Sequence, residues 1–375
     1  MLLGLQGLRA LAAFSVAISH SWDSPIRAAS WFHGSVLVVD LFFILSGFMV
    51  TAAYGARDLD ARAGADLVVA RLGRLYPLHL FTLLLWLAIA FGKQGVQLVV
   101  QAAGYGAGMT PLAEQPQIFD AGYFLLSLVL LHGVGIVDSD LFNFAAWSIS
   151  AEFWAFTTIV AVFATVPGRR ARLAVIGMLI AVCAGWFAMD WWDPATGAFD
   201  TSIRLEKLLA RSVLDYGVGV FALHAARRWL PRVRSASALG ALQGLLLVAI
   251  ALTVSNQPSL PWSQLWVLPL WAALVVSLGD DRGWLARVLG TRALVWLGER
   301  SYGIYMAHAL IRMLYYHAQK HIPNADAPGT SALLLLPYLG LTVLFAHWLH
   351  TRVEMPAAAW TKAWLRGRRQ PRALA

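Results

Sequence analysis

Ten apolar stretches, separated by short polar segments, account for most of the chain. Each is close to the roughly 20 residues that a helix needs to cross the hydrocarbon core of a bilayer. Their pattern predicts an all-α integral membrane protein with about ten transmembrane helices. The stretches run approximately over 6–22, 35–54, 75–92, 147–166, 172–190, 211–225, 238–255, 262–279, 299–317 and 331–351.

Two further apolar segments, 95–110 and 121–133, fit this pattern less well. The second is short for a membrane span, and counting it as one would reverse the orientation of everything that follows. We therefore interpret the region near 95–133 as re-entrant or interfacial structure.

The composition and the distribution of charge support the same picture. Hydrophobic residues make up 59% of the chain and charged residues 13%, against about 25% charged residues in a typical soluble domain. With ten spans and a cytoplasmic N-terminus, most of the 29 Lys and Arg residues fall in cytoplasmic segments, as the positive-inside rule requires. Topology thus explains the net charge of +9, and we expect no nucleic-acid partner.

The same reasoning divides the chain into a transmembrane domain, 1–352, and a basic tail, 353–375. Both termini are expected in the cytoplasm. Tryptophans and arginines in the tail are typical of a segment that binds the surface of an anionic membrane.

Arg9 and His20 are the most conspicuous polar residues of the first stretch. At about 100° per residue, the eleven steps between them turn a helix by three turns and about 20°. Both side chains therefore point the same way, about 16 Å apart along the axis. Such groups are costly in lipid and commonly mark a functional site. The alternative is an arginine that binds headgroups and a histidine satisfied inside the bundle.

Arg71 and Arg74 lie three residues apart at the expected cytoplasmic start of the third span, where Pro77 suits the first turn of a helix. Two guanidinium groups on one helix face can bind phosphate through their forked donors. Ordinary anchoring to lipid headgroups is the alternative.

Acidic and hydroxyl groups also occur within the apolar stretches. Asp40, near the start of the second stretch, can either orient the imidazole of His20 or pair with an arginine, and Asp23 competes for the first role. Ser148 and Glu152 share a face at the outer end of the fourth stretch, where a functional role and simple helix capping are both open.

Other polar groups at membrane depth either line a cavity or satisfy one another: Asp215, Tyr302, Tyr305, His308 and Arg312. No convincing set of metal ligands is visible in the sequence, so we expect no metal cofactor. Phosphate-loop, nucleophile-elbow and Cys/His-dyad motifs are also missing from it.

Five of these motifs, in this order, resemble those of the membrane-bound acyltransferase-3 family. Two positions depart from the usual pattern, Gln6 in place of an Asp and Phe153 in place of a second Glu. The chain resembles the stand-alone branch, without a C-terminal esterase-like domain. The matching segments are Leu5-Gln-Gly-Leu-Arg9 with His20, Asp40-Leu-Phe-Phe-Ile-Leu-Ser-Gly-Phe, Arg71-x-x-Arg74-x-Tyr-Pro, Trp147-Ser-Ile-Ser-Ala-Glu152, and Ser301-Tyr302-Gly-Ile-Tyr-x-x-His308.

The resemblance implies transfer of an acyl group from cytoplasmic acyl-CoA, with acetyl-CoA the favoured donor, to a hydroxyl of an extracytoplasmic acceptor. A cell-surface saccharide is the expected acceptor, and the inner (plasma) membrane of a bacterium the expected location. A thioester is already activated, so the protein must supply a base, charge stabilisation and proximity.

Each candidate residue then has an expected role. His20 would be the general base, because imidazole can accept a proton near neutral pH. Arg9 would hold the donor or the developing oxyanion, and Arg71 and Arg74 the phosphates of the coenzyme. Glu152 would position the hydroxyls of the acceptor. Asp40, Ser148, Tyr302 and His308 are candidates for binding or orienting substrate.

Two other functional classes fit parts of the pattern. Ten spans with a polar stripe also suit a transporter of a lipid-linked sugar or another small polar molecule, although no inverted repeat is visible. A purely structural membrane subunit would leave the buried charges unexplained.

Overall fold

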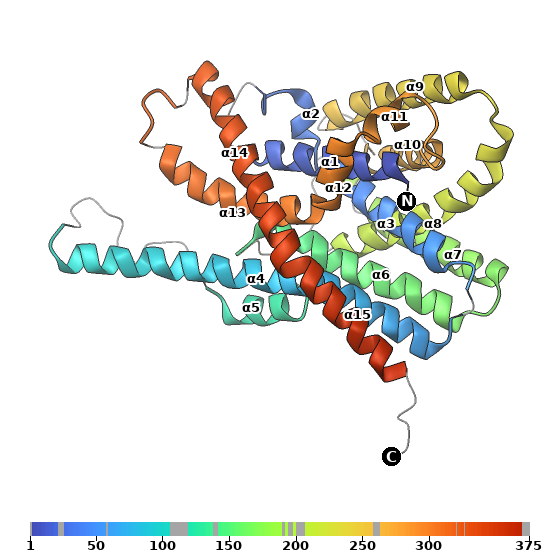
Figure 1. Cartoon of the computed structure of the whole chain (residues 1–375), viewed down its shortest axis with the longest axis horizontal. Coiled ribbons are helices and arrows are strands. Elements are labelled where there is room, and N and C mark those ends of the chain that lie inside the picture. The colour runs from blue at the N-terminus through green and yellow to red at the C-terminus, as the bar shows by residue number, and fades with distance from the viewer. Residues whose placement is uncertain are drawn as a thin grey trace, which may run out of the picture.

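Helices form nearly all of the structure (Figure 1), a computed structural model that describes residues 2–21, 26–57, 59–105, 119–137, 142–189, 192–193, 198–199, 207–257, 263–319, 321–325 and 327–369. Within these residues the one sheet is an antiparallel pair of two-residue strands, β1 (Trp192–Asp193) and β2 (Ala198–Phe199). The predicted all-α class is confirmed.

A helix covers most of each of the ten apolar stretches. These helices are α1 (Leu3–Ser19), α3 (Leu37–Tyr54), α4 (Ala61–Ala102), α6 (Trp147–Thr165), α7 (Arg169–Met189), α8 (Leu208–Trp229), α9 (Ala236–Ser255), α10 (Ser263–Ser277), α13 (Ser301–Gln319) and α14 (Pro328–Leu349). Shorter elements are α2 (Ser30–His33), α5 (Ala121–Leu128), α11 (Trp284–Leu289), α12 (Arg292–Glu299) and α15 (Met355–Arg369), with 3-10 turns at Phe144–Ala146 and Leu230–Arg232 and a π-helical turn at His350–Glu354.

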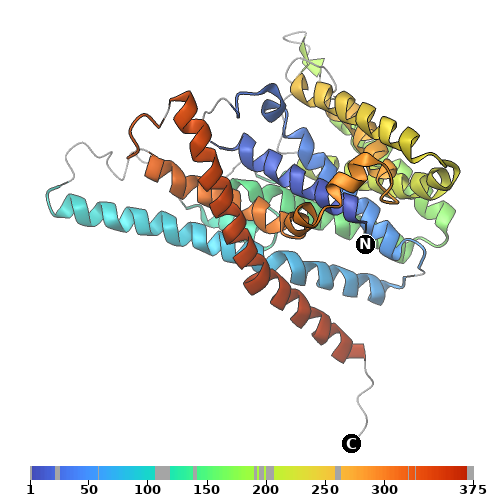
Figure 2. The ribbon, with the colours of Figure 1, turned by 45° about the horizontal axis from the view of Figure 1, so that its top comes forward.

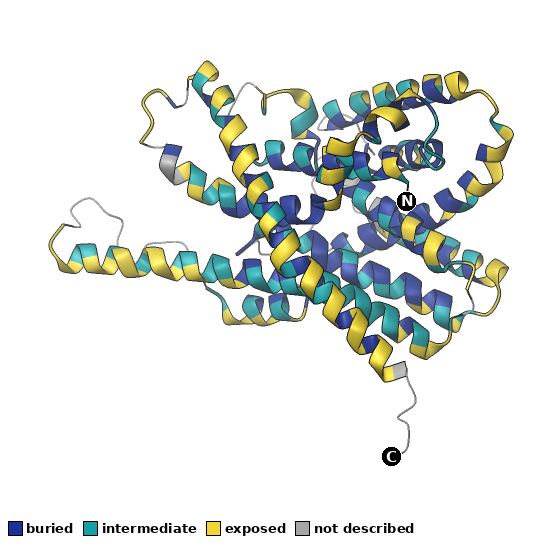
Figure 3. Ribbon diagram, viewed as in Figure 1, coloured by how far each residue is buried: buried dark blue, intermediate teal, exposed yellow. Residues whose placement is uncertain are grey.

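Six helical segments of the described residues are long and apolar enough to cross a membrane. Helices α1 and α10 are apolar but shorter, at 17 and 15 residues. Large apolar side chains such as Val96, Leu245 and Leu336 are exposed, as expected where lipid replaces water. Figure 3 shows exposed positions along the outer helices. The number of spans stays a prediction.

Helix α4 differs from its predicted form. It begins at Ala61, where the carboxylate of Asp60 accepts a hydrogen bond of 2.6 Å from the amide of Ala63, and it continues to Ala102. The polar segment before Arg71 is rich in good helix formers and has this strong N-cap. Pro77 therefore lies inside the helix, so its predicted place in the first turn was wrong.

The region predicted to be re-entrant or interfacial is only partly described. Residues 95–102 continue α4, and 106–118 lie outside the described residues. Helix α5 begins at an Asp120 cap and has 8 residues, about 12 Å of helix. That length is too short to cross a bilayer.

The core forms where α3 and α8 cross at close range. A Cβ on Gly47 would lie 2.1 Å from the carbonyl oxygen of Tyr216, and one on Gly219 would lie 2.1 Å from that of Ile44. No larger residue fits at either position without moving a backbone, so these two glycines set the distance between the helices.

The C-terminal helices cross the rest of the molecule. Helix α14 continues through the π-helical turn into α15, and this long rod passes over α4 (Figures 1 and 2). The predicted domain boundary at 352 falls inside that turn.

Candidate active site: two cavities along helix α1

The larger of two cavities, about 640 Å³ in volume, lies at the N-terminal end of α1. Its wall combines cationic and acidic side chains with aromatic hydroxyls, and the groups named below come from five helices. Functional groups on it are Arg9 from α1, Arg71 and Arg74 from α4, Glu152 from α6, Tyr302 and Tyr305 from α13, and Lys362 and Arg366 from α15.

The smaller cavity, about 270 Å³, lies at the other end of α1. His20 lines it together with Ser19, Arg27 and His33, and aromatic rings of Phe144 and Trp147 complete the wall. Tyr305 lines both cavities and therefore stands between them. Arg9 lies within α1 and His20 at its C-cap, and each lines its own cavity.

His20 has one ring nitrogen fixed and one available. It caps the C-terminus of α1, and its Nδ1 lies 2.9 Å from the carbonyl oxygen of Val16. Because a carbonyl can only accept, Nδ1 carries the hydrogen and Nε2 of the neutral ring is left as an acceptor. Nε2 makes no hydrogen bond with any residue that the structure describes. The ring packs 5.0 Å from Phe144 and 5.3 Å from His308, centroid to centroid.

His308 repeats this arrangement. It is fully buried, its Nδ1 lies 2.5 Å from the carbonyl oxygen of Tyr305, and its Nε2 has no partner among the described residues. Helix α13 thus places a second imidazole, with its acceptor nitrogen unused, beside His20. Arg312, one turn further along α13, is exposed.

Glu152 lies with Arg71 rather than apart from it. Its Oε1 forms an ion pair with the Arg71 guanidinium and accepts hydrogen bonds from Ser46 (2.9 Å) and Tyr216 (3.4 Å). Arg71 also lies over the ring of Phe156. The sequence placed Arg71 near a helix start at the membrane surface, whereas α4 begins ten residues earlier, so Arg71 reaches the depth of Glu152.

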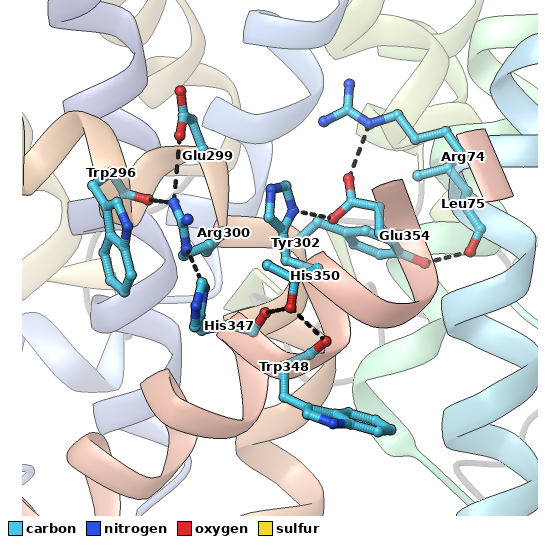
Figure 4. A network of polar contacts seen from close by, with 11 residues as sticks. Arg74, Leu75, Trp296, Glu299, Arg300, Tyr302, His347, Trp348, His350 and Glu354 are labelled. Carbon is cyan, nitrogen blue, oxygen red and sulfur yellow. Dashed lines mark hydrogen bonds and ion pairs between the residues drawn. The ribbon is translucent and has the colours of Figure 1, made fainter. Parts of the chain in front are cut away.

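Arg74 belongs to a network that sequence reasoning missed (Figure 4). Its Nε donates to Glu354 at 3.1 Å, and Nδ1 of His350 lies 2.8 Å from the same carboxylate. Tyr302 donates to the carbonyl of Leu75 at 2.7 Å. Glu354 is 1% exposed, although it had been placed in the tail. The four-residue spacing of His350 and Glu354 was the available signal, because it puts both on one helix face.

Asp40 pairs with an arginine and not with His20. Nε of Arg211 donates to its carboxylate at 2.5 Å, and the two side chains are 1% and 3% exposed. Of the two open alternatives, the structure therefore shows the second. Asp215 lies one turn along α8, fully buried, with neither carboxylate oxygen hydrogen-bonded to a described residue. Asp23 lies outside the described residues.

The remaining candidates lie at a helix start and on a cavity wall. Ser148 donates to the carbonyl of Ala145 at 3.3 Å in the first turn of α6, and no side chain caps that N-terminus, so the structure does not show the capping role. Tyr302 lines the larger cavity. The described residues contain no group of three or more His, Cys, Asp or Glu side chains that could hold a metal ion.

Comparison with known proteins identifies the class. The model of the acyltransferase domain of the acyltransferase-3 family matches residues 2–351, so this chain belongs to that family. No solved structure matches it.

Among named relatives, the "Putative peptidoglycan O-acetyltransferase YrhL" of Bacillus subtilis strain 168 is 27% identical over 81% of this chain and 48% of its own length. The acyltransferase MdmB of Streptomyces mycarofaciens is 26% identical over 100% of this chain and 94% of its own. A "Putative O-acetyltransferase" of Staphylococcus aureus strain COL is 22% identical over 94% of this chain and 56% of its own length. The chain thus spans about half the length of the Bacillus and Staphylococcus relatives.

Proposed function

We propose that the protein transfers an acyl group, with acetyl favoured, from acyl-CoA in the larger cavity to a hydroxyl of an acceptor in the smaller one. The observation that carries this proposal is the pair of cavities with Tyr305 in the wall of both. One cavity gathers guanidinium groups suited to phosphates, and the other contains an imidazole with a free acceptor nitrogen. The slender pantetheine arm of the donor suits a path from the first cavity toward the second.

The chemistry then follows from the placement of the side chains. Nε2 of His20 takes the proton of the acceptor hydroxyl as its oxygen attacks the thioester carbonyl. The new C–O bond forms, the C–S bond breaks, and the departing thiolate takes up a proton. Arg9, which makes no hydrogen bond or ion pair with any described residue, stabilises negative charge on the donor or on the oxyanion.

His308 and Glu152 act by positioning other groups. The ring of His308 is neutral, and its Nδ1 is occupied by a backbone carbonyl. Its free Nε2 therefore stabilises the positive charge that His20 acquires when it takes the proton. Glu152 holds Arg71 in the wall of the larger cavity through the contacts that it shares with Ser46 and Tyr216. This replaces the expected role of Glu152 as a ligand of the acceptor.

A saccharide is the proposed acceptor. The smaller cavity combines polar groups of Ser19 and His33 with rings of Phe32, Phe144 and Trp147, a mixture that suits hydroxyls and the apolar faces of sugar rings. The name of YrhL, which refers to peptidoglycan, supports a polymer of the cell surface.

Acyl-CoA use is tested with purified protein in lipid nanodiscs. Water in place of the acceptor should hydrolyse acetyl-CoA to acetate and free CoA thiol, and Arg74→Ala should raise the apparent KM for acetyl-CoA by about ten-fold or more with kcat nearly unchanged. A hydrogen bond to a charged group contributes about 1.5–3 kcal/mol, and loss of uniform binding acts on KM alone.

Arg71→Ala differs, because Arg71 is the cation paired with Glu152, whereas after Arg74→Ala the carboxylate of Glu354 keeps its contact with His350, so a lower yield of folded protein is expected for Arg71→Ala. A protein that releases no thiol from acetyl-CoA would contradict the proposed use of this donor. An Arg74→Ala variant with unchanged KM but lower kcat would contradict the phosphate role.

We also propose ten spans with both termini in the cytoplasm of a bacterial inner membrane. Helix α1 then runs outward, so the larger cavity faces the cytoplasm, where acyl-CoA is made, and the smaller cavity faces outside. Helix α6 runs in the opposite direction to α1, from Trp147 at the smaller cavity to Glu152 at the larger one. This direction agrees with the proposed orientation.

Reporter fusions test the topology. Fusions after Pro167 and after Arg369 should report cytoplasm, and a fusion after Gln115 should report periplasm. Alkaline phosphatase activity from the Pro167 fusion would refute the ten-span arrangement, since it would require α5 or its surroundings to cross the membrane.

A further inference from the structure

We propose that helix α15 forms part of the donor site, with Lys362 and Arg366 binding the phosphate groups of acyl-CoA. This inference rests on the proposed function. The match to the acyltransferase-3 family ends at residue 351, so α15 lies beyond the region that the family model describes. The sequence assigned this segment to a tail on the membrane surface, whereas in the structure it closes one side of the larger cavity.

One face of α15 points into that cavity. Met355, Ala358, Ala359, Lys362 and Arg366 all line it, and their spacing of three and four residues defines a single helix face. Small alanines near the start of the helix leave room in the cavity, and the two long cationic side chains follow along the same face.

The adjacent face of α15 is packed on α4, which fixes this orientation. Thr361 and Leu365 are buried, and a Cβ on Gly73 would lie 2.2 Å from the Oγ1 atom of Thr361. Gly73 separates Arg71 from Arg74 along the chain, so the close approach of α15 occurs at the two arginines of the cavity. A rotation of α15 that moved Lys362 out of the cavity would also expose Leu365.

The charges in the cavity are only partly neutralised within the protein. Arg71 is paired with Glu152 and Arg74 with Glu354. Lys362 and Arg366, like Arg9, form no ion pair with any residue that the structure describes. Acyl-CoA carries a diphosphate and a 3′-phosphate, and separate cations on the rim and wall of one cavity suit several phosphates on one ligand.

Glu354 connects the helix to the arginines of α4. It lies in the π-helical turn between α14 and α15, a conformation often found at functional sites, and holds Arg74 together with His350. The turn therefore places Lys362 and Arg366 two and three helical turns further along the same cavity wall. Figure 4 shows this connection from His350 through Glu354 to Arg74.

Anionic lipid headgroups offer the same phosphate chemistry, so the experiment must separate the two sources. Arg368 provides a matched control, because it lies on the same helix, is exposed, stacks 4.7 Å from the ring of Trp364 and does not line the cavity. A general effect of positive charge near lipid would appear equally at Arg366 and Arg368.

The test compares the Lys362→Ala/Arg366→Ala double variant, Arg368→Ala and wild type in nanodiscs of neutral phosphatidylcholine. Two donors are used, acetyl-CoA and S-acetyl-pantetheine, which has the thioester without the phosphates. The double variant should show an apparent KM for acetyl-CoA raised by about ten-fold to a hundred-fold, with kcat nearly unchanged. Its KM for S-acetyl-pantetheine should equal that of the wild type, and Arg368→Ala should match the wild type with both donors.

The outcomes separate this inference from the proposed function. If wild type uses acetyl-CoA and the double variant keeps its KM, α15 is outside the donor site while the proposed function stands. If KM rises equally for both donors, the variant has disturbed the cavity and the phosphate role is wrong. An effect that appears only when anionic lipid is added would assign the two cations to headgroups. A wild type that does not use acetyl-CoA overturns both proposals.

Discussion

Replacement of His20 with alanine is expected to reduce acyl transfer by about 10²–10⁴-fold, the usual contribution of a general base, while the helices stay folded. The reason is local geometry. Nδ1 is held by the carbonyl of Val16, so Nε2 is the acceptor that faces the smaller cavity. Alanine removes this acceptor without breaking α1, because His20 lies just beyond the last helical residue.

His224 supplies a matched control for this variant. Its Nδ1 also lies 2.9 Å from the carbonyl oxygen four residues earlier, that of Val220, and it lines neither cavity. His224→Ala should therefore keep wild-type activity. Acyl incorporation into the acceptor is measured with radiolabelled donor, and size-exclusion chromatography confirms that each variant is folded. Wild-type transfer by a folded His20→Ala protein would end the assignment of the base.

The positions of the helices could be predicted from the sequence because they depend on local periodicity. Each apolar stretch became a helix with ends within a few residues in most cases, and the separation of Arg9 from His20 along α1 needed only the rise of an α-helix. Helix α4 was the exception. Its start depended on the Asp60 cap and on good helix formers in a polar segment, which an analysis of apolar stretches does not count.

The partners of the buried charges could not be predicted in the same way. Arg71 and Glu152 are 81 residues apart, and Asp40 and Arg211 are 171 apart. Helical periodicity gives the face of each side chain but not the helix that it will meet. The close crossing of α3 and α8 at Gly47 and Gly219 decides that Asp40 meets Arg211, and this depends on packing over the whole bundle.

The second prediction with a large effect concerns this buried pair and its neighbour. Arg211 pairs with Asp40, which is 1% exposed, and lies one helical turn from the fully buried Asp215. Arg211→Met should therefore leave the buried carboxylate of Asp40 without its cation and lower the free energy of unfolding by about 3–5 kcal/mol. Asp40→Asn should lower the free energy of unfolding clearly less, because Arg211 still has the carboxyl group of Asp215 one helical turn away.

Unfolding of the purified variants by sodium dodecyl sulfate, followed by circular dichroism, measures this asymmetry. The control is Asp280→Asn, whose partner Arg282 is 34% exposed, and a change of at most about 1 kcal/mol is expected for a pair so open to solvent. The double variant Arg211→Met/Asp40→Asn should recover part of the loss, since one unpaired carboxylate is removed. Equal losses of unfolding free energy in Arg211→Met and Asp40→Asn would show that Asp215 does not interact with the guanidinium of Arg211.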